Sequence, residues 1–156
     1  MINYQVITPD DVFKSPEVHA YVDAGNTCLG AMGFTEHGFA HAKRTSNYAR
    51  DILSSLGFPR RSCELAAIAG YMHDIGNVIN REDHAHSGAA MAFTLLTNMG
   101  MPPEEISQIC SAIGYHDEKT DYPVNPIAAA LILSDKTDVR RTRVRKNAVI
   151  DIDIHD

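Results

Sequence analysis

The chain is poor in cysteine and has no long hydrophobic run. Its three cysteines include no CxxC pair, so a disulfide scaffold is not indicated, and they are expected to be small apolar residues of a reduced protein. No apolar segment approaches the length of a transmembrane helix. The first residues, MINYQVITPDD, lack the basic and apolar regions of a signal peptide. We therefore expect a cytoplasmic protein with no membrane partner.

An excess of positive charge is also missing. The sequence has 14 basic and 20 acidic residues, which gives a formal net charge of −6. The protein as a whole thus has no electrostatic reason to bind a nucleic acid polymer or an anionic membrane. A small phosphorylated substrate is not excluded, because a small anion responds to the local field of a metal. The 156 residues, 44% of them hydrophobic, fit one domain with a single core.

Proline and glycine divide the sequence into segments of helical length. Strand signals are scarce until the alternating segment AVIDIDI near the end of the chain. The sequence therefore predicts an all-α domain of six or seven helices. The expected helices begin with a short one at Pro9 and continue over about 16–30, 39–56, 59–75, 84–99, 103–115 and 126–138.

Histidine is abundant, with eight residues, and several histidines continue the apolar stripes of predicted helices. Moving three or four residues along a stripe repeatedly reaches a potential metal ligand on the inward face. Each one alone could be a satisfied core histidine or a helix-end charge. Burying several together is costly unless a cation compensates, and a divalent metal ion does so. The residues are His41, His73, His84, His116 and Asp135.

This ordered set resembles the HD-domain superfamily of metal-dependent phosphohydrolases, which is named for an adjacent His-Asp pair. The matching segments are HAKRTSNYA with His41, YMHDIGN with His73 and Asp74, and LILSDKTD with Asp135. The resemblance extends from about residue 38 to residue 138 and implies a helical bundle with the metal site in its core. It also implies that these four residues are metal ligands.

A subset of the superfamily uses additional histidines to bind a second metal. The segment HAHSGAA resembles the HxxxG stretch of this subset and nominates His84, whereas His86 would face elsewhere on a helix. The segment IGYHDEKTDYP resembles the HHE stretch and nominates His116. In this subset Asp74 would bridge two metals. The resemblance thus implies one or two divalent transition metals, with Fe, Mn, Zn, Ni and Co all compatible.

The departures from the cyclic-dinucleotide phosphodiesterases of this superfamily are specific. Asn77 replaces the Lys of DIGK, Asp117 replaces the second His of HHE, and only Tyr122-Pro123 remains of the GYP end. Hydrolysis of a cyclic dinucleotide and a third metal are therefore disfavoured.

The resemblance implies hydrolysis of a phosphate ester or anhydride, as a phosphomonoesterase or phosphodiesterase acting on a nucleotide or another small phosphorylated molecule. Asp74 would ligate metal and orient or deprotonate a water. Arg44, one turn after His41, and Lys136, next to Asp135, are predicted to hold the phosphate. Two alternatives stay open, a di-iron oxygenase on the same fold and a non-catalytic regulatory module.

Three segments follow from this interpretation. Residues 1–36 are expected to form N-terminal helices packed on the core, and residues 37–146 the HD phosphohydrolase domain. Residues 147–156 form a tail that is strand-like or truncated. Apolar surface on the N-terminal helices could serve a homodimer, and the basic run over 140–146 is interpreted as a solvated helix face or an oligomer contact.

Overall fold

The computed structural model describes residues 3–146, which form seven α-helices and two short 3-10 helices with no strand in that range. The prediction of an all-α fold is thereby confirmed. The elements are α1 (Pro9–Lys14), α2 (Pro16–Ala31), α3 (Phe39–Ser55), α4 (Arg60–Met72), η1 (Ile75–Val78), α5 (His84–Met99), α6 (Pro103–Gly114), α7 (Pro126–Lys136) and η2 (Arg141–Arg143).

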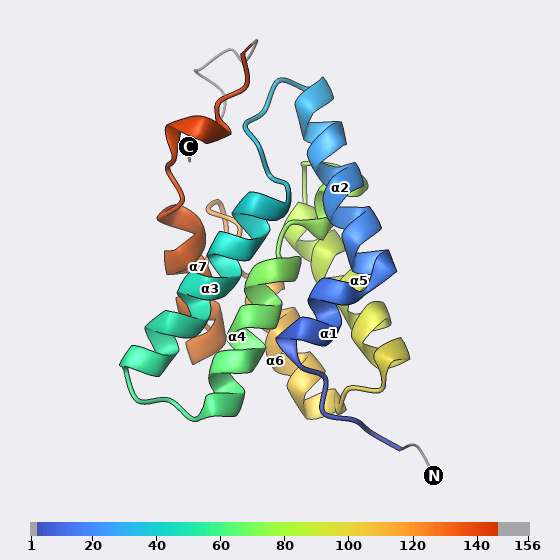
Figure 1. The fold of residues 1–156 in the computed structure, drawn as a ribbon, viewed down its shortest axis with the longest axis vertical. Helices are drawn as coiled ribbons and strands as arrows, with labels where there is room; N and C mark the ends of the chain where they lie inside the picture. The colour runs from blue at the N-terminus through green and yellow to red at the C-terminus, as the bar shows by residue number, and fades with distance from the viewer. Residues whose placement is uncertain (1–2, 147–156) are drawn as a thin grey trace.

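Helix α4 lies at the centre of the bundle and packs against α1, α3, α6 and α7 (Figure 1). Its side chains Ile68, Ala69 and Met72 are fully buried. Gly70 allows α3 to approach closely, because a Cβ at this position would lie 2.8 Å from the Cα of Ser46. This close packing of α3 on α4 brings the first turn of α3 near the end of α4, where two of the predicted ligands lie.

The helix starts follow recognisable capping signals. Thr8 forms a capping box with Asp11, and Ser15 and Asn125 accept hydrogen bonds from the first turns of α2 and α7. Gly100 ends α5 with φ of 88°, a left-handed conformation that glycine adopts without strain. Helix α1 packs on α4, and α2 packs on η1. The starts of α1, α2 and α7 agree with the positions expected from the sequence.

The end of α4 differs from the prediction. The sequence favours a helix reaching Ile75, but α4 ends at Met72 and η1 begins at Ile75. The backbone of Gly76 packs so tightly against the first turn of α5 that a Cβ there would clash with the carbonyl of His84. This tertiary contact overrides the helical propensity of the segment. Asp74 consequently lies in the turn between the two elements, facing α5.

The basic run after α7 forms contacts within the chain. Arg143 donates to the carbonyl of Glu36, and Arg145 donates to the carbonyl of Phe34. Arg143 is 6% exposed, so this part of the run is not a solvated helix face. The arginines instead hold the segment that follows α7 against the loop between α2 and α3. The predicted strand-like tail, 148–154, lies outside the described residues.

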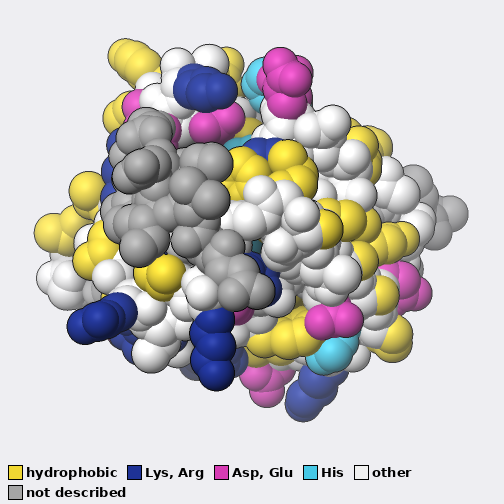
Figure 2. Space-filling view, turned by 90° about the horizontal axis from the view of Figure 1, so that it is seen from above, with side chains coloured by type: hydrophobic (Ala, Val, Ile, Leu, Met, Phe, Trp, Pro, Cys, Tyr) yellow, Lys and Arg dark blue, Asp and Glu magenta, His cyan; other side chains and the backbone are white. Residues whose placement is uncertain are grey.

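The surface of the bundle carries mixed charges. On the described part of the face in Figure 2, basic and acidic side chains are interspersed with hydrophobic ones. In the range 3–146, no helix is long and apolar enough to cross a membrane.

Candidate metal centre

Two pairs of buried histidines face each other in the middle of the bundle. His41 from the first turn of α3 and His73 at the end of α4 have their Nε2 atoms 3.2 Å apart. His84, which begins α5, and His116, which follows α6, also have their Nε2 atoms 3.2 Å apart. All four side chains are at most 3% exposed. The packing of four helices therefore creates two clusters of imidazole nitrogen.

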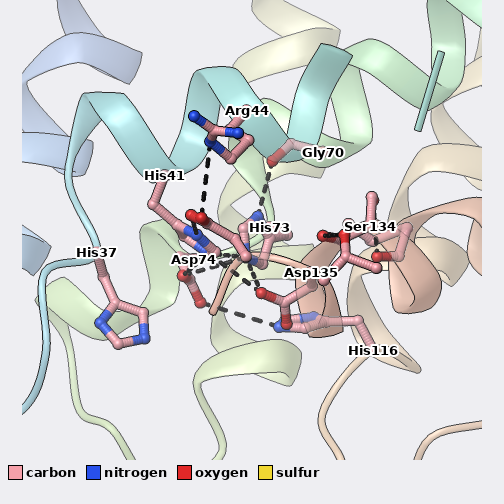
Figure 3. A network of polar contacts seen from close by, with 12 residues as sticks. His37, His41, Arg44, Gly70, His73, Asp74, His116, Ser134 and Asp135 are labelled. Atoms are coloured by element: carbon pink, nitrogen blue, oxygen red, sulfur yellow. Dashed lines mark hydrogen bonds and ion pairs between the residues drawn. The ribbon is translucent and has the colours of Figure 1, made fainter. Parts of the chain in front are cut away.

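Asp74 lies between the two pairs. Its Oδ2 is 3.4 Å from Nε2 of His41 and 3.1 Å from Nε2 of His73. Its Oδ1 is 3.5 Å from Nε2 of His84 and 3.9 Å from Nε2 of His116, the contact drawn toward His116 in Figure 3. One carboxylate thus presents one oxygen to each pair.

Asp135, near the end of α7, adds a second carboxylate to the first pair. Its Oδ1 is 3.1 Å from Nε2 of His41 and 3.4 Å from Nε2 of His73. The structure therefore brings together all six residues that the sequence nominates as ligands. Their ligand atoms form three overlapping groups that could hold a metal ion: His41, His73, Asp74; His73, His116, Asp135; and Asp74, His84, His116.

The other ring nitrogen of three of these histidines is occupied by the backbone. In each case Nδ1 donates to the carbonyl of the residue three positions earlier, which leaves Nε2 facing the centre. A metal-ligating histidine usually has such a partner, because it fixes the tautomer and the ring orientation. The distances are 2.7 Å for His73 to Gly70, 3.0 Å for His84 to Arg81 and 2.6 Å for His116 to Ile113.

His41 is held differently, by a carboxylate that the sequence analysis missed. Its Nδ1 lies 2.8 Å from Oδ2 of Asp138, a side chain that is fully buried. Asp138 is in turn bound by Arg140, and its carbonyl accepts a hydrogen bond from Arg143. The only sequence signal was an aspartate one helical turn after Asp135. Its partner is 97 residues away, so no local pattern identifies it.

The donor set fits a divalent cation. In the His84–His116 pair both Nδ1 atoms donate to carbonyls and burial lowers the pKa of both rings, so the two neutral rings direct the lone pairs of their Nε2 atoms at each other. Ligands about 2.1 Å from one ion at tetrahedral or octahedral angles lie roughly 3.0–3.4 Å apart, and 3.2 Å falls in this range. Asp74 Oδ2 is buried with no hydrogen bond directed at it from a described residue. A cation would satisfy this oxygen.

The two pairs differ in charge. Burial lowers the pKa of His41, but the nearby carboxylates of Asp135, Asp138 and Asp74 outweigh burial and raise it to about 9. In the second pair burial dominates, and with the neighbouring imidazoles it lowers the pKa of His116 to about 4. The first pair is therefore surrounded by negative charge, whereas the second is predominantly neutral.

A cavity of about 810 Å³ leads to the centre and is lined by Asp74, Asp135, His84 and His116. His37 also lines the cavity, although it is only 7% exposed. In Figure 3 His37 stands apart from the cluster. The cations in the described lining are Arg81, Lys119 and Arg143.

Neither predicted phosphate-binding cation is among these lining residues. Arg44 donates to the hydroxyl of Tyr48 and lies 3.6 Å from a carboxylate oxygen of Asp138 (Figure 3). Lys136 is bound to Asp121. The assignment of Arg44 and Lys136 to the phosphate therefore stays a prediction, and the cavity offers other cations for that role.

Comparison with known protein families matches residues 38–156 to the HD domain. The chain belongs to the HD-domain family, whose domains bind divalent metals. A curated relative, an uncharacterized protein of Methanocaldococcus jannaschii, is 27% identical over 105 residues, covering 58% of this chain and 40% of the relative. The chain thus corresponds to less than half the length of that relative.

A solved structure is also similar. The crystal structure of a predicted HD superfamily hydrolase from an uncultured Thermotogales bacterium matches with a TM-score of 0.60 and 26% identity. The match covers 77% of this chain and 65% of that one. The fold and the family inferred from the His-Asp pattern are confirmed by these comparisons.

Proposed function

We propose that the protein is a two-metal phosphohydrolase acting on a small phosphorylated molecule. The observation that carries this proposal is the position of Asp74 between two histidine pairs of equal spacing. In this proposal His41, His73 and Asp135 would hold one divalent metal, His84 and His116 would hold the other, and Asp74 would be a ligand of both. When bound, such metals would polarise a phosphoryl group and lower the pKa of a water.

The chain's own residues would fix this chemistry in place. The backbone carbonyls bonded to Nδ1 of His73, His84 and His116 hold the three rings, so little reorganisation is needed when a metal binds. Asp138 does the same for His41. The ligands lie in or directly after five helices, α3 to α7, and in the turn at Asp74, and rigid elements keep such a centre more precise than loops do.

The charge of the cavity supports a small substrate with its negative charge at one phosphate. Besides Asp74 and Asp135, four acidic residues line the described wall, against three basic ones. A polyanion extending away from the metals would meet this acidic wall and be repelled. A phosphate ester with a neutral or cationic remainder would not. The four residues are Glu82, Asp83, Asp117 and Glu118.

The test is hydrolysis by protein reloaded with Mn²⁺, Fe²⁺, Co²⁺, Ni²⁺ or Zn²⁺ after chelation. A panel of p-nitrophenyl phosphate, bis-p-nitrophenyl phosphate, sugar phosphates, nucleoside monophosphates and nucleoside triphosphates separates monoester, diester and polyanionic substrates. Metal-dependent release of phosphate or alcohol, weakest with triphosphates, is expected. Oxygen consumption by the iron-loaded protein without phosphate release would favour an oxygenase instead. Metal binding with neither activity would favour a regulatory module.

A further inference from the structure

Arg81 lies in the loop between η1 and α5, and its half-buried side chain lines the cavity together with Asp74 and His84. Its backbone is part of the metal centre, because the Arg81 carbonyl accepts the hydrogen bond from Nδ1 of His84. The backbone of Arg81 is therefore held beside a predicted ligand. Arg81 is the cation of the described cavity wall that is tied most directly to the centre.

The guanidinium of Arg81 is held on two sides. Its Nη1 donates to Oδ1 of Asn77 at 3.4 Å, and its central carbon lies 5.5 Å from the ring centroid of Phe34. Within residues 3–146, no carboxylate lies within ion-pair distance of it. Arg143, by contrast, lies 3.9 Å from Asp138, and its Nε and Nη1 atoms donate hydrogen bonds to backbone carbonyls. Arg81 thus keeps donors and charge for a ligand in the cavity.

Asn77 connects Arg81 to the bridging carboxylate. Its Nδ2 donates to Oδ1 of Asp74 at 3.2 Å and to the Asp74 carbonyl at 3.0 Å, while its Oδ1 accepts from Arg81. The side chain is buried. An amide can donate to an aspartate and accept from an arginine at the same time, whereas lysine has no acceptor and an ionised carboxylate no donor. Asn77 is therefore suited to set the distance between Arg81 and Asp74.

We propose that Arg81 binds the phosphate of the substrate beside the metals, and that Asn77 is the residue that positions it. This inference rests on the proposed phosphohydrolase function and identifies the residue that recognises the anion. A guanidinium can bond two oxygens of one phosphate in parallel, which a lysine cannot do. In this arrangement Arg81 would contact the phosphate held at the metal centre, and the acidic residues of the cavity wall would be left for the rest of the substrate.

The experiment is calorimetric titration of inorganic phosphate into the full chain loaded with Mn²⁺, with metal content and melting temperature measured on each sample. Arg81→Gln should weaken phosphate binding roughly 10- to 100-fold, because charge-assisted hydrogen bonds are lost. Its metal content should equal that of the wild type. Arg81→Lys should bind phosphate with intermediate affinity. The matched control is Lys119→Gln, an exposed lining cation, which should change the affinity by less than about twofold.

The positioning role of Asn77 is tested by combining a variant at Asn77 with the variant at Arg81. Asn77→Ala should weaken phosphate binding, but the double variant Asn77→Ala, Arg81→Gln should bind no more weakly than Arg81→Gln alone. Additive losses would contradict a positioning role, because a residue with only a structural effect would act regardless of Arg81.

Either of two results with the variants overturns the role of Arg81. One is phosphate affinity in Arg81→Gln equal to that of the wild type, and the other is an equal loss in Lys119→Gln, which would indicate a general charge effect. Absence of phosphate binding by the metal-loaded wild type also overturns it. If the wild type hydrolyses a phosphate ester but Arg81→Gln binds phosphate as tightly as the wild type, the role of Arg81 is refuted and the proposed function is not. Wild-type protein that binds metal but hydrolyses no phosphate ester refutes the proposed function.

Discussion

The His41–His73 pair and the His84–His116 pair have equal nitrogen separations, 3.2 Å in each case, but different surroundings. The first pair meets Asp135 and is backed by Asp138. The second pair contacts Asp74, which also contacts the first pair, and its rings are backed by backbone carbonyls. The two pairs thus have the same nitrogen spacing, but more negative charge surrounds the first pair than the second.

This difference separates two functions of a ligand group. Spacing decides whether nitrogen atoms can share an ion, whereas nearby carboxylates decide how strongly the site compensates the charge of that ion. We therefore expect the first group of ligands, His41, His73 and Asp135, to bind its metal more tightly. The second group, His84 and His116, should exchange its metal more readily. Asp74 couples the groups because it belongs to both. Variants at each position test this division.

The largest effect is expected from Asp74→Ala, which removes the one residue common to both groups. Both metals should be lost, and hydrolysis should fall by at least about a thousandfold, since the metal chemistry depends on both. Helix content by circular dichroism should be retained, because the apolar core does not include this side chain. Asp51→Ala, at an exposed carboxylate of α3, is the control. A fully metallated and active Asp74→Ala variant would falsify the assignment.

His84→Ala should affect only the second group. Metal content should fall from two ions per chain to one, and hydrolysis should fall roughly 100-fold, because one of two metals is missing. The first group should keep its ion, since its ligands lie on α3, α4 and α7. Elemental analysis together with the activity assay provides both readings. Loss of both ions in His84→Ala would show that the groups are not separable.

Asp138→Asn addresses the support behind His41 without removing a ligand. The amide is similar in size but lacks the negative charge that favours the ring proton on Nδ1. The affinity of the first group for metal should fall about 10- to 100-fold, while that of the second group should stay the same. Competition with a chelator of known affinity measures both. Equal weakening of both groups, or of neither, would contradict the separate support of His41.

The smallest expected effect is a difference in pH dependence between the groups in the metal-free protein. The pKa of His41 is raised to about 9, so below pH 9 a proton must leave before metal binds. Metal affinity of the first group should therefore rise with pH, about tenfold between pH 7 and pH 8 for one released proton. The pKa of His116 is lowered to about 4, so its ring is already neutral at these values. Metal titration at several pH values should show an affinity that rises with pH for the first group and one that stays constant for the second. The same pH dependence in both groups would contradict the difference in charge between them.

The fold, and the set of histidines that lie together, could be predicted from the sequence. Apolar stripes with their capping residues identify the helices, and His41 and His84 continue these stripes because the metal centre is part of the core. Periodicity fails at the end of α4, where the close contact of Gly76 with α5 ends the helix early. Contacts of this kind depend on packing between distant segments and leave no local signal.

The cations and supporting residues of the site were less predictable. Arg44 and Lys136 were predicted from the family resemblance and from their positions beside the ligands, and this assignment stays a prediction, whereas Arg81, which lines the cavity, was not identified. Arg81 lies in an irregular loop, where no periodicity indicates direction. Asp138 follows the last turn of α7 and contacts a histidine from α3. Both roles depend on which elements meet in space, and hence on the tertiary structure.

The central claim is that Asp74 joins two metal sites, and counting metal ions in the wild-type protein tests it most directly. The protein should be purified without chelators and analysed for transition metals, with the ions counted per chain. Close to two ions per chain is predicted, with one ion removed by a chelator before the other. One ion or none, in protein exposed to excess Mn²⁺, Fe²⁺ and Zn²⁺, would contradict the account.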